Sequence, residues 1–225
     1  MIIVSLFDES GNMVRPWAID GHQCFCFDLQ NNGKVETFPS GGKITFLGGD
    51  LSEPAAREVI KNLKPGLIFA FPPCTDLAVS GAKHFASKLA KNPHYLRDAM
   101  SLVYLAADIA NECGEVPYMI ENPVSVISSQ WRKPDFIFHP WYFGGYLPVN
   151  DVHPRFPDIL PPRDAYPKKT CLWVGNGFKM PMAVPVTPQK DNPGWAKLGG
   201  KSARTKKIRS ETPRGFAIAV QTVNS

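Results

Sequence analysis

The chain has 225 residues, of which 44% are hydrophobic, so it can bury a sizeable core and global disorder is excluded. The net charge is only +5, but residues 190–214 alone carry +6, a concentration that indicates either a polyanionic partner or a solvated loop. No apolar run reaches the length of a membrane span, the N-terminus lacks the basic lead of a signal peptide, and the five cysteines lack zinc-type spacing. We therefore expect a cytoplasmic protein with free thiols and no metal.

Predicted strands and helices alternate along the chain. Short apolar runs bounded by turn residues predict strands at 2–7, 22–27, 43–47, 66–71, 116–120 and 170–174. Helical spacing and capping signals predict helices at 14–19, from a Ser52 cap to about 63, at 95–112 and at 212–223. Residues 80–92 are predicted to form a polar and basic loop. This alternation is typical of an α/β fold in which helices cover both faces of a mostly parallel sheet.

Five predicted strands run into a residue that could serve a ligand, namely Gly11, Asp28, Asp50, Cys74 and Glu121. Each could be a turn or capping residue, but open α/β sheets bind their ligands beyond the carboxyl ends of the strands. The carboxylates of Asp28 and Asp50 suit the hydroxyl and amino donors of a nucleoside. Cys74 follows two prolines that stop strand pairing, and it is either a nucleophile or a buried structural cysteine.

The chain resembles cytosine-C5 DNA methyltransferases nearly from end to end, as a small phage-type member without a large target-recognition domain. The resemblance is carried by Phe7 to Gly11, Phe71-Pro72-Pro73-Cys74 with Ser80-Gly81, Ile120-Glu121-Asn122-Pro123, Lys168 to Trp173, and Arg209-Ser210 with Thr212-Pro213-Arg214-Gly215. It implies a Rossmann-like methyltransferase fold and S-adenosyl-L-methionine as cofactor. It also implies methyl transfer to C5 of cytosine in double-stranded DNA, in a bacterium or a phage-infected host cell.

The resemblance further implies a role for individual residues. Cys74 is the nucleophile that attacks cytosine C6 after the base is flipped out of the helix, and Glu121 acts at N3. The remaining catalytic candidates are Asn122 and Lys168. The cofactor-binding candidates are Phe7, Asp8, Gly11, Asp28, Leu29, Asp50, Leu51, Pro73 and Arg214. The DNA-binding candidates are Ser80, Lys83, His84, Lys201, Arg204, Lys206, Lys207 and Arg209.

The chain departs from the family pattern at several positions. Glu9 replaces the middle glycine of the first motif, and Lys168 and Thr170 replace the arginine pair that recognises the substrate O2 in larger members. No separate recognition domain is present. We predict a catalytic core over 1–174, a short basic region at 175–205 in place of that domain, and a C-terminal helix over 206–225 that returns to the core, in a monomer.

Two other functions stay open at this point. A methylase acting on a free pyrimidine nucleotide is one, because thymidylate synthases also carry Pro-Pro-Cys. A non-catalytic DNA-binding relative is the other. The basic segment and the Glu-Asn-Pro motif favour a polymeric substrate, and the presence of Cys74 and Glu121 favours turnover. With few residues left for base readout, we expect a short recognition context around the target cytosine.

Overall fold

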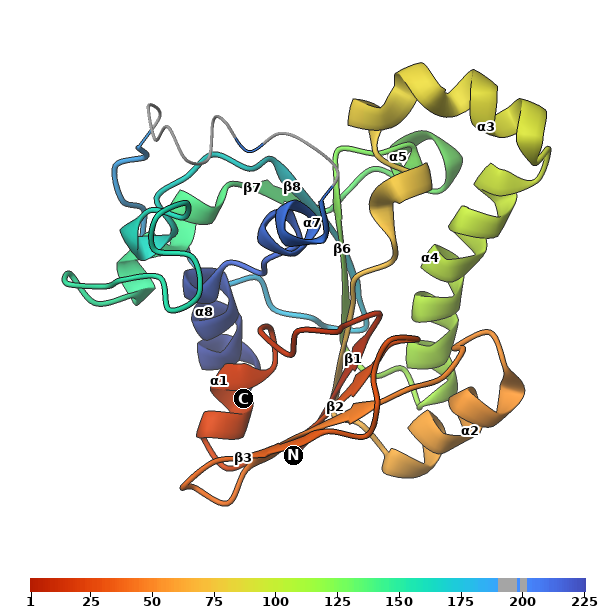
Figure 1. Cartoon of the computed structure of the whole chain (residues 1–225). Coiled ribbons are helices and arrows are strands. Elements are labelled where there is room, and N and C mark those ends of the chain that lie inside the picture. Colours follow the sequence, from red (N-terminus) through yellow and green to blue (C-terminus); the bar gives the residue numbers. More distant parts are fainter. Residues whose placement is uncertain (190–197, 199–201) are drawn as a thin grey trace. The chain divides into compact units, whose positions relative to one another are not determined.

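The computed structural model describes residues 1–189, 198 and 202–225, which form two compact units (Figure 1). Unit 1 consists of Met1–Ile137 and Thr170–Phe178, and unit 2 consists of Phe138–Lys169 and Lys179–Ser225. Each unit is therefore assembled from two separate stretches of chain. These boundaries differ from the predicted division after residues 174 and 205, and the recognition role of residues 175–205 stays a prediction.

An eight-stranded mixed sheet forms the centre of unit 1, in the order β3-β4-β2-β1-β5-β6-β8-β7. Its strands are β1 (Ile2–Leu6), β2 (Gln23–Phe27), β3 (Val35–Thr37), β4 (Lys43–Leu47), β5 (Leu67–Ala70), β6 (Tyr118–Pro123), β7 (Phe136–Phe138) and β8 (Thr170–Gly175). Strands β4, β2, β1, β5 and β6 are parallel, whereas β3 is antiparallel to β4 and β8 is antiparallel to β6. The predicted α/β class with a mostly parallel sheet is confirmed.

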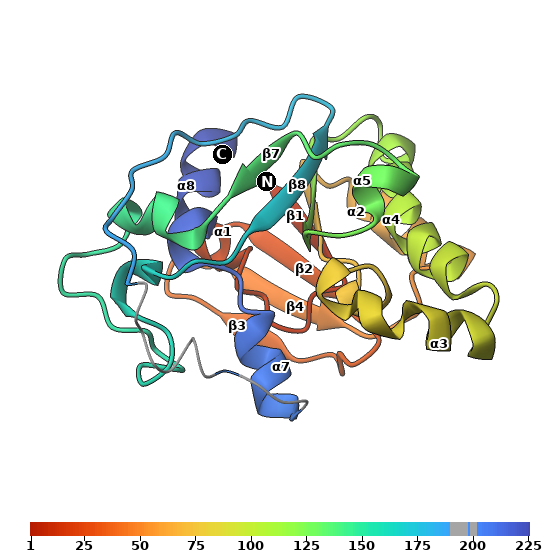
Figure 2. The same cartoon turned by 90° about the horizontal axis from the view of Figure 1, so that it is seen from above.

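Helices cover both faces of this sheet, because successive strand side chains point to opposite sides (Figures 1 and 2). Leu6 of β1 packs in a buried cluster with Ile60 and Val103 from the helices on one face. On the other face, Phe69 of β5 lies against Trp17, with ring centroids 5.2 Å apart. The helical elements of unit 1 are α1 (Arg15–Ile19), α2 (Pro54–Leu63), η1 (Cys74–Asp76), η2 (Val79–His84), α3 (Phe85–Lys91), α4 (Tyr95–Glu112) and α5 (Ile127–Gln130).

Several elements differ from the sequence-based expectation. Strands β3 and β7 were not predicted, because three residues are too few for a recognisable alternation. The expected loop at 80–92 is mostly helical, as η2 and α3. Ser52 does not cap α2: Glu53 is the N-cap residue, and the Ser52 hydroxyl instead donates to Asp50 at 2.7 Å. Serine favours such local side-chain hydrogen bonds, which compete with capping.

Unit 2 has a small aromatic core of its own. The rings of Phe138 and Phe216 stack with centroids 4.3 Å apart, and Phe143 packs 5.1 Å from Phe216. Gly215 allows the main chain to approach closely here, since a Cβ on it would lie 2.3 Å from the Phe143 carbonyl oxygen. The helical elements of unit 2 are η3 (Pro140–Tyr146), η4 (Pro162–Asp164), α7 (Ala203–Arg209) and α8 (Arg214–Asn224).

The predicted C-terminal helix over 206–225 is two helices, α7 and α8, with a break between them. The break falls at residues 210–213, and Pro213 explains it, because a proline disfavours helical geometry in the residue that precedes it. Helix α7 begins with a true cap, in which the Ser202 hydroxyl accepts from the backbone N–H of Thr205 at 3.1 Å. The segment predicted as a loop up to residue 205 therefore already enters a helix.

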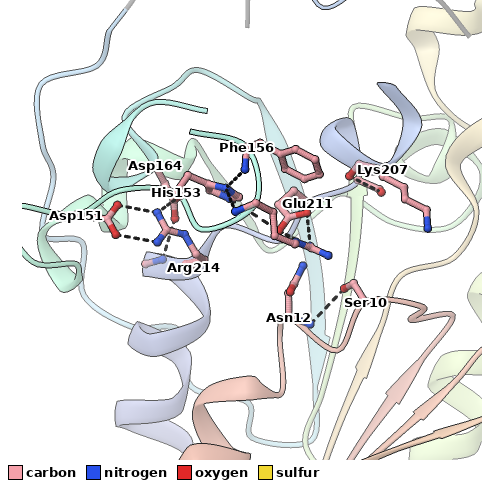
Figure 3. A network of polar contacts seen from close by, with 12 residues as sticks. Ser10, Asn12, Asp151, His153, Phe156, Asp164, Lys207, Glu211 and Arg214 are labelled. Carbon is pink, nitrogen blue, oxygen red and sulfur yellow. Dashed lines mark hydrogen bonds and ion pairs between the residues drawn. The ribbon is translucent and has the colours of Figure 1, made fainter. Parts of the chain in front are cut away.

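A buried ionic network centred on Arg214 joins α8 to the loops of unit 2 (Figure 3). Its guanidinium donates to both carboxylate oxygens of Asp151, at 2.8 and 2.6 Å, and to Asp164 at 3.4 Å. Asp164 also accepts from the backbone N–H of Gly215 at 2.9 Å. Burial raises the pKa of the Asp164 carboxyl, and the nearby positive charge of Arg214 opposes this increase. Asp164 has a φ of 48°, in the left-handed region, so this geometry is held against backbone strain.

His153 is almost fully buried beside this network, at 1% exposure. Its Nδ1 accepts from the backbone N–H groups of Arg155 and Phe156, at 3.3 and 3.0 Å, so Nε2 carries the proton of the neutral ring. Nε2 lies 3.8 Å from Oε1 of Glu211. The Glu211 carboxylate also forms an ion pair with Arg155. Burial, reinforced by the charges of Arg214 and Arg155, lowers the pKa of His153 from 6.5 to about 4.

The low pKa of His153 predicts a pH-dependent stability. Between pH 6.5 and about 4 the unfolded chain binds a proton at this ring that the folded chain does not. This stabilising contribution is complete above pH 6.5 and is lost as the pH falls, by up to about 3 kcal/mol. In His153→Gln the unfolding free energy should depend less steeply on pH in this range. The decrease in slope should correspond to about one fewer proton bound on unfolding. Urea unfolding across the range measures it. The exposed His94→Gln is the control, and an equal change in that variant would contradict the assignment.

Candidate active site

The carboxyl ends of the five parallel strands lie along one edge of the sheet. Their last paired residues form a row across it, from β4 to β6: Leu47, Phe27, Leu6, Ala70 and Ile120. One position beyond that row stand Gly48, Asp28, Phe7, Phe71 and Glu121. The chain moves outward from β1 to β4 and then returns to the other side of β1 as β5. The strand order therefore reverses between β1 and β5, the place where open α/β sheets bind ligands.

The turn after β1 is shaped by the buried carboxylate of Asp8. Its Oδ1 accepts from the backbone N–H groups of Ser10 and Gly11, both at 2.8 Å, and its Oδ2 accepts from the Ser5 hydroxyl at 2.8 Å. Phe7 and Gly11 both have left-handed backbone conformations, with φ of 57° and 66°. The turn is thus bent at its two ends and held by Asp8 in its interior. Because the left-handed conformations fall at Phe7 and Gly11, the turn does not require a glycine at position 9, where the exposed Glu9 stands.

The two acidic residues after β2 and β4 have different surroundings. Asp28 is half-buried, and its Oδ1 accepts from the backbone N–H of Gln30 at 2.9 Å, whereas its Oδ2 has no hydrogen-bond partner within the described part of the chain. Burial raises its pKa, and the nearby charges of Glu9 and Asp8 add to this. Asp50 is exposed, and its hydrogen bonds from Ser52 lower its pKa.

The two leucines that follow these acids also differ. Leu29 is 74% exposed and presents an apolar side chain next to the half-buried Asp28. Leu51 is only 3% exposed and belongs to the core of unit 1. Of the two strand ends, the one after β2 therefore offers both a free carboxylate oxygen and an accessible apolar surface.

Cys74 is exposed and begins η1, directly after the two prolines that end β5. Its carbonyl oxygen accepts from the backbone N–H groups of Leu77 and Ala78, at 3.1 and 2.8 Å, which closes the turn. By contrast Cys24 and Cys26 are buried, and burial raises the pKa of Cys24 to about 12 and that of Cys26 well above its usual range. The exposure of Cys74 removes the alternative of a buried structural cysteine.

The turn that carries Cys74 is hydrogen-bonded to the segment that follows Glu121. The side-chain amide of Asn122, 1% exposed, donates from Nδ2 to the Pro72 carbonyl oxygen at 2.9 Å. The backbone N–H of Val79 donates to Val124, and that of Val126 donates to Leu77, both at 3.0 Å. Glu121 follows Ile120, which pairs with Ala70, the last residue of β5. The turn that carries Cys74 therefore follows the strand that pairs with β6, the strand that contains Glu121.

Two buried polar atoms at this junction lack a partner. Asn122 Oδ1 and the hydroxyl oxygen of Ser125 have no hydrogen bond to any of the residues that the structure describes. Buried polar atoms in folded proteins are nearly always satisfied, by the protein, by ordered water or by a ligand. At this junction, next to the two motifs, the described protein therefore leaves two buried polar atoms unsatisfied.

The DNA-binding candidates fall into two groups. Ser80, Lys83 and His84 are exposed on η2 in unit 1. In unit 2, α7 buries Thr205 and Ile208 and exposes its basic residues Arg204, Lys206, Lys207 and Arg209. Lys201 lies outside the described residues.

The other candidates are placed as follows. Pro73 is exposed and directly precedes Cys74. Lys168 belongs to unit 2, two residues before β8, and Arg214 is held in the unit 2 network by Asp151 and Asp164.

Two residues that shape the site were missed by the sequence analysis. Asn31 donates from Nδ2 to the carbonyl oxygens of Asp8 and Cys26, at 3.2 and 2.9 Å, and so ties the turns after β1 and β2 together. Lys88 of α3 contacts Thr75 and Asp76, the two residues after Cys74. No local pattern marks either residue, because each partner lies too far along the chain for a periodicity to connect them.

No protein-family model and no curated protein matches the chain. Among solved structures, one match is a protein described provisionally as a DNA modification methyltransferase encoded within a prophage of E. coli. It shares 13% sequence identity with this chain, with a TM-score of 0.47, and the alignment covers 100% of this chain and 69% of that one. A likeness at this level supports no functional assignment.

Within the described ranges, no helix is both long and apolar enough to cross a membrane. The same residues contain no cluster of three or more histidine, cysteine, aspartate or glutamate side chains suited to a metal ion.

Proposed function

We propose that this chain is a DNA (cytosine-5-)-methyltransferase, which transfers a methyl group from S-adenosyl-L-methionine to C5 of cytosine in double-stranded DNA. The observation that carries the proposal is the junction of the two motifs. Cys74 is exposed in the turn that follows β5, Glu121 lies in the neighbouring strand β6, and the Asn122 side chain bonds to Pro72, two residues before Cys74. The strand order, which reverses beside this junction, supports a Rossmann-like methyltransferase fold.

The proposed chemistry begins with Cys74, because cytosine C5 is too weak a nucleophile to be methylated directly. The thiolate adds to C6 of a flipped-out cytosine, and the ring electrons move toward N3, where Glu121 holds a proton that neutralises the developing charge. C5 is now nucleophilic and takes the methyl group as the S–CH3 bond breaks, with the bonding pair staying on the sulfur of a neutral thioether. Loss of the C5 proton to water then expels the Cys74 thiolate, and N3 returns its proton to Glu121, which restores the aromatic base. Asn122 keeps Glu121 and the nucleophile turn in register through Pro72.

The end of β2 and the turn after β1 fit S-adenosyl-L-methionine, which supplies an electrophilic methyl group on its sulfonium sulfur. Asp28 has a half-buried carboxylate oxygen with no partner in the described part of unit 1, which suits a ribose hydroxyl, and Leu29 offers an apolar surface next to it. Asp50 retains acceptor capacity for an amino group. Asp8 would act through the shape of the turn, since its oxygens are already bonded. Contact of Arg214 with the cofactor stays a prediction.

Polymeric DNA suits the exposed charge of this chain better than a free nucleotide does. Basic side chains occur on η2 in unit 1 and again on α7 in unit 2, and four of the seven α7 residues are basic and exposed. A duplex backbone offers an extended series of phosphates to such groups, which would supply most of the affinity without selecting a sequence. Our proposal includes a short recognition context and action as a monomer in the cytoplasm of a bacterium or an infected host.

The nucleophile can be tested by covalent trapping. Duplex DNA containing 5-fluorocytosine should form a stable adduct with the wild-type chain, because fluorine at C5 cannot leave as a proton does. Peptide mapping should place the adduct on Cys74, and Cys74→Ser should abolish both the adduct and methyl transfer, since a serine hydroxyl does not replace a thiolate. The partly exposed Cys113→Ser serves as the control and should keep both. An adduct on any other cysteine would overturn the assignment.

The cofactor site can be tested by comparing two aspartates that the sequence does not distinguish. Asp28→Ala should weaken S-adenosyl-L-methionine binding by about 1–3 kcal/mol with little change in stability, because Oδ2 has no partner in the described protein and Oδ1 accepts only from the exposed Gln30 N–H. Asp8→Ala should instead lower the unfolding free energy by about 1–3 kcal/mol or more, because it leaves buried donors of its own turn unpaired. Calorimetry and urea unfolding separate the two effects. Unchanged affinity in Asp28→Ala would remove it from the site.

The DNA interface can be tested through its salt dependence. Replacing Lys206 and Lys207 together by glutamine should weaken binding to all duplexes alike and flatten the plot of log affinity against log salt by about 0.9 for each lost phosphate contact. Lys43 and Lys61, exposed elsewhere in unit 1, give a control pair that removes the same charge. An equal loss in the control pair would show that net charge alone, and not α7, sets the affinity.

A further inference from the structure

The three-residue turn η1, which carries Cys74, has little stability of its own. A single 3-10 turn is poorly hydrogen-bonded, and the two prolines before it prevent the chain from continuing in the sheet. Its first carbonyl, that of Cys74, is satisfied by the N–H groups of Leu77 and Ala78. The residues on either side of this turn are held by the segment after Glu121, and a further contact at Thr75 and Asp76 would fix its middle.

Lys88 of α3 supplies that contact. Its ammonium donates to the Thr75 carbonyl oxygen at 2.6 Å and lies 2.7 Å from Asp76 Oδ1, so one side chain binds two consecutive residues of η1. The Lys88 side chain is 26% exposed and also lies 5.9 Å from the centre of the Phe85 ring. A fully exposed ion pair contributes little to stability, but here the ammonium also donates to a main-chain carbonyl next to the nucleophile.

The charge on the rest of this segment makes Lys88 distinctive. Lys83, His84 and Lys91 are all exposed. Lys88 is instead directed back onto the turn, across 13 residues of sequence. Its position therefore fits a structural connection between α3 and the nucleophile turn better than it fits a contact with an external phosphate.

We propose that Lys88 is a positioning residue, whose ammonium holds the main chain of η1, and with it Cys74, in the conformation from which the thiolate attacks. The inference rests on the proposed methyl transfer, because attack on C6 requires the sulfur within a narrow range of distance and angle. Lys88 itself contacts neither base nor cofactor. Its removal should slow the covalent step while leaving the affinity for both ligands unchanged.

The first measurement does not depend on methyl transfer. Amide hydrogen exchange of Leu77 and Ala78, which donate to the Cys74 carbonyl, reports opening of the turn. In Lys88→Met, which keeps the aliphatic stem, exchange should be faster by about three- to tenfold. Lys91→Met removes the same charge from the same helix without touching the turn, and it should exchange like the wild type. Equal exchange in the wild type and Lys88→Met would overturn the proposal.

The second measurement separates positioning from DNA binding. Under single-turnover conditions, at saturating DNA and cofactor, Lys88→Met should transfer the methyl group about tenfold more slowly, with a DNA Kd equal to that of Lys91→Met. Lys88→Arg should recover part of the rate, because a guanidinium can still reach both acceptors. If Lys91→Met is slowed to the same extent, or if only the Kd for DNA changes, Lys88 acts as a charge and the positioning role is wrong.

Asp76→Asn provides an independent variant, which removes the ion pair but leaves the Thr75 carbonyl in place. It should show a smaller effect in the same direction, and combining it with Lys88→Met should add nothing further, because both changes act through one contact. Additive effects would overturn the proposal. A wild-type chain that transfers no methyl group would refute the proposed function, while the exchange measurement would still decide whether Lys88 holds the turn.

Discussion

The hydrogen bond from the Asn122 side chain to the Pro72 carbonyl determines how the two halves of the candidate site meet. Pro72 and Pro73 follow β5 and have no backbone N–H to donate, so backbone hydrogen bonds of the sheet no longer position the chain there. The buried Pro72 carbonyl still requires a donor, and the neighbouring strand provides one from a side chain instead of its backbone. Asn122 can do this because it is paired with Cys171 of β8 and has no freedom to move away. The pairing of β6 and β8 therefore fixes the position of the turn that carries Cys74.

The strand ends show how one residue type takes several roles within a short distance along one edge. The carboxylate oxygens of Asp8 accept hydrogen bonds from its own turn and from Ser5. Asp50 is exposed and accepts from Ser52. Asp28 is half-buried and has one oxygen without a hydrogen-bond partner in the described part of the chain. A motif places all three at the same edge but does not distinguish them. The number of donors that each carboxylate already satisfies is what separates a residue that shapes the site from one that is free to bind.

Sequence reasoning was most successful where a pattern repeats within one element. The apolar runs at 43–47 and 66–71 and the helix at 95–112 were identified, and the parallel arrangement followed from the alternation of strands and helices. Elements of three residues, such as β3 and β7, have no such repeat. Residues 138–169 combine prolines and aromatics without periodicity, so the second unit was not foreseen. Arg214 was assigned to the cofactor from its motif, and only the structure shows the carboxylates of Asp151 and Asp164 around it, 63 and 50 residues away in sequence.

The interleaving of the two units has a consequence for the order in which the chain can fold during synthesis. Strand β8 completes the sheet of unit 1, yet it emerges only after the whole of the first segment of unit 2, residues 138–169. Until then β6 has an unpaired edge on that side, which is the kind of surface through which nascent chains associate wrongly. Unit 2 in turn is incomplete until α8 has been synthesised. Unit 1 is therefore complete only after the first segment of unit 2 has been made, and a premature stop anywhere before residue 170 leaves both units incomplete.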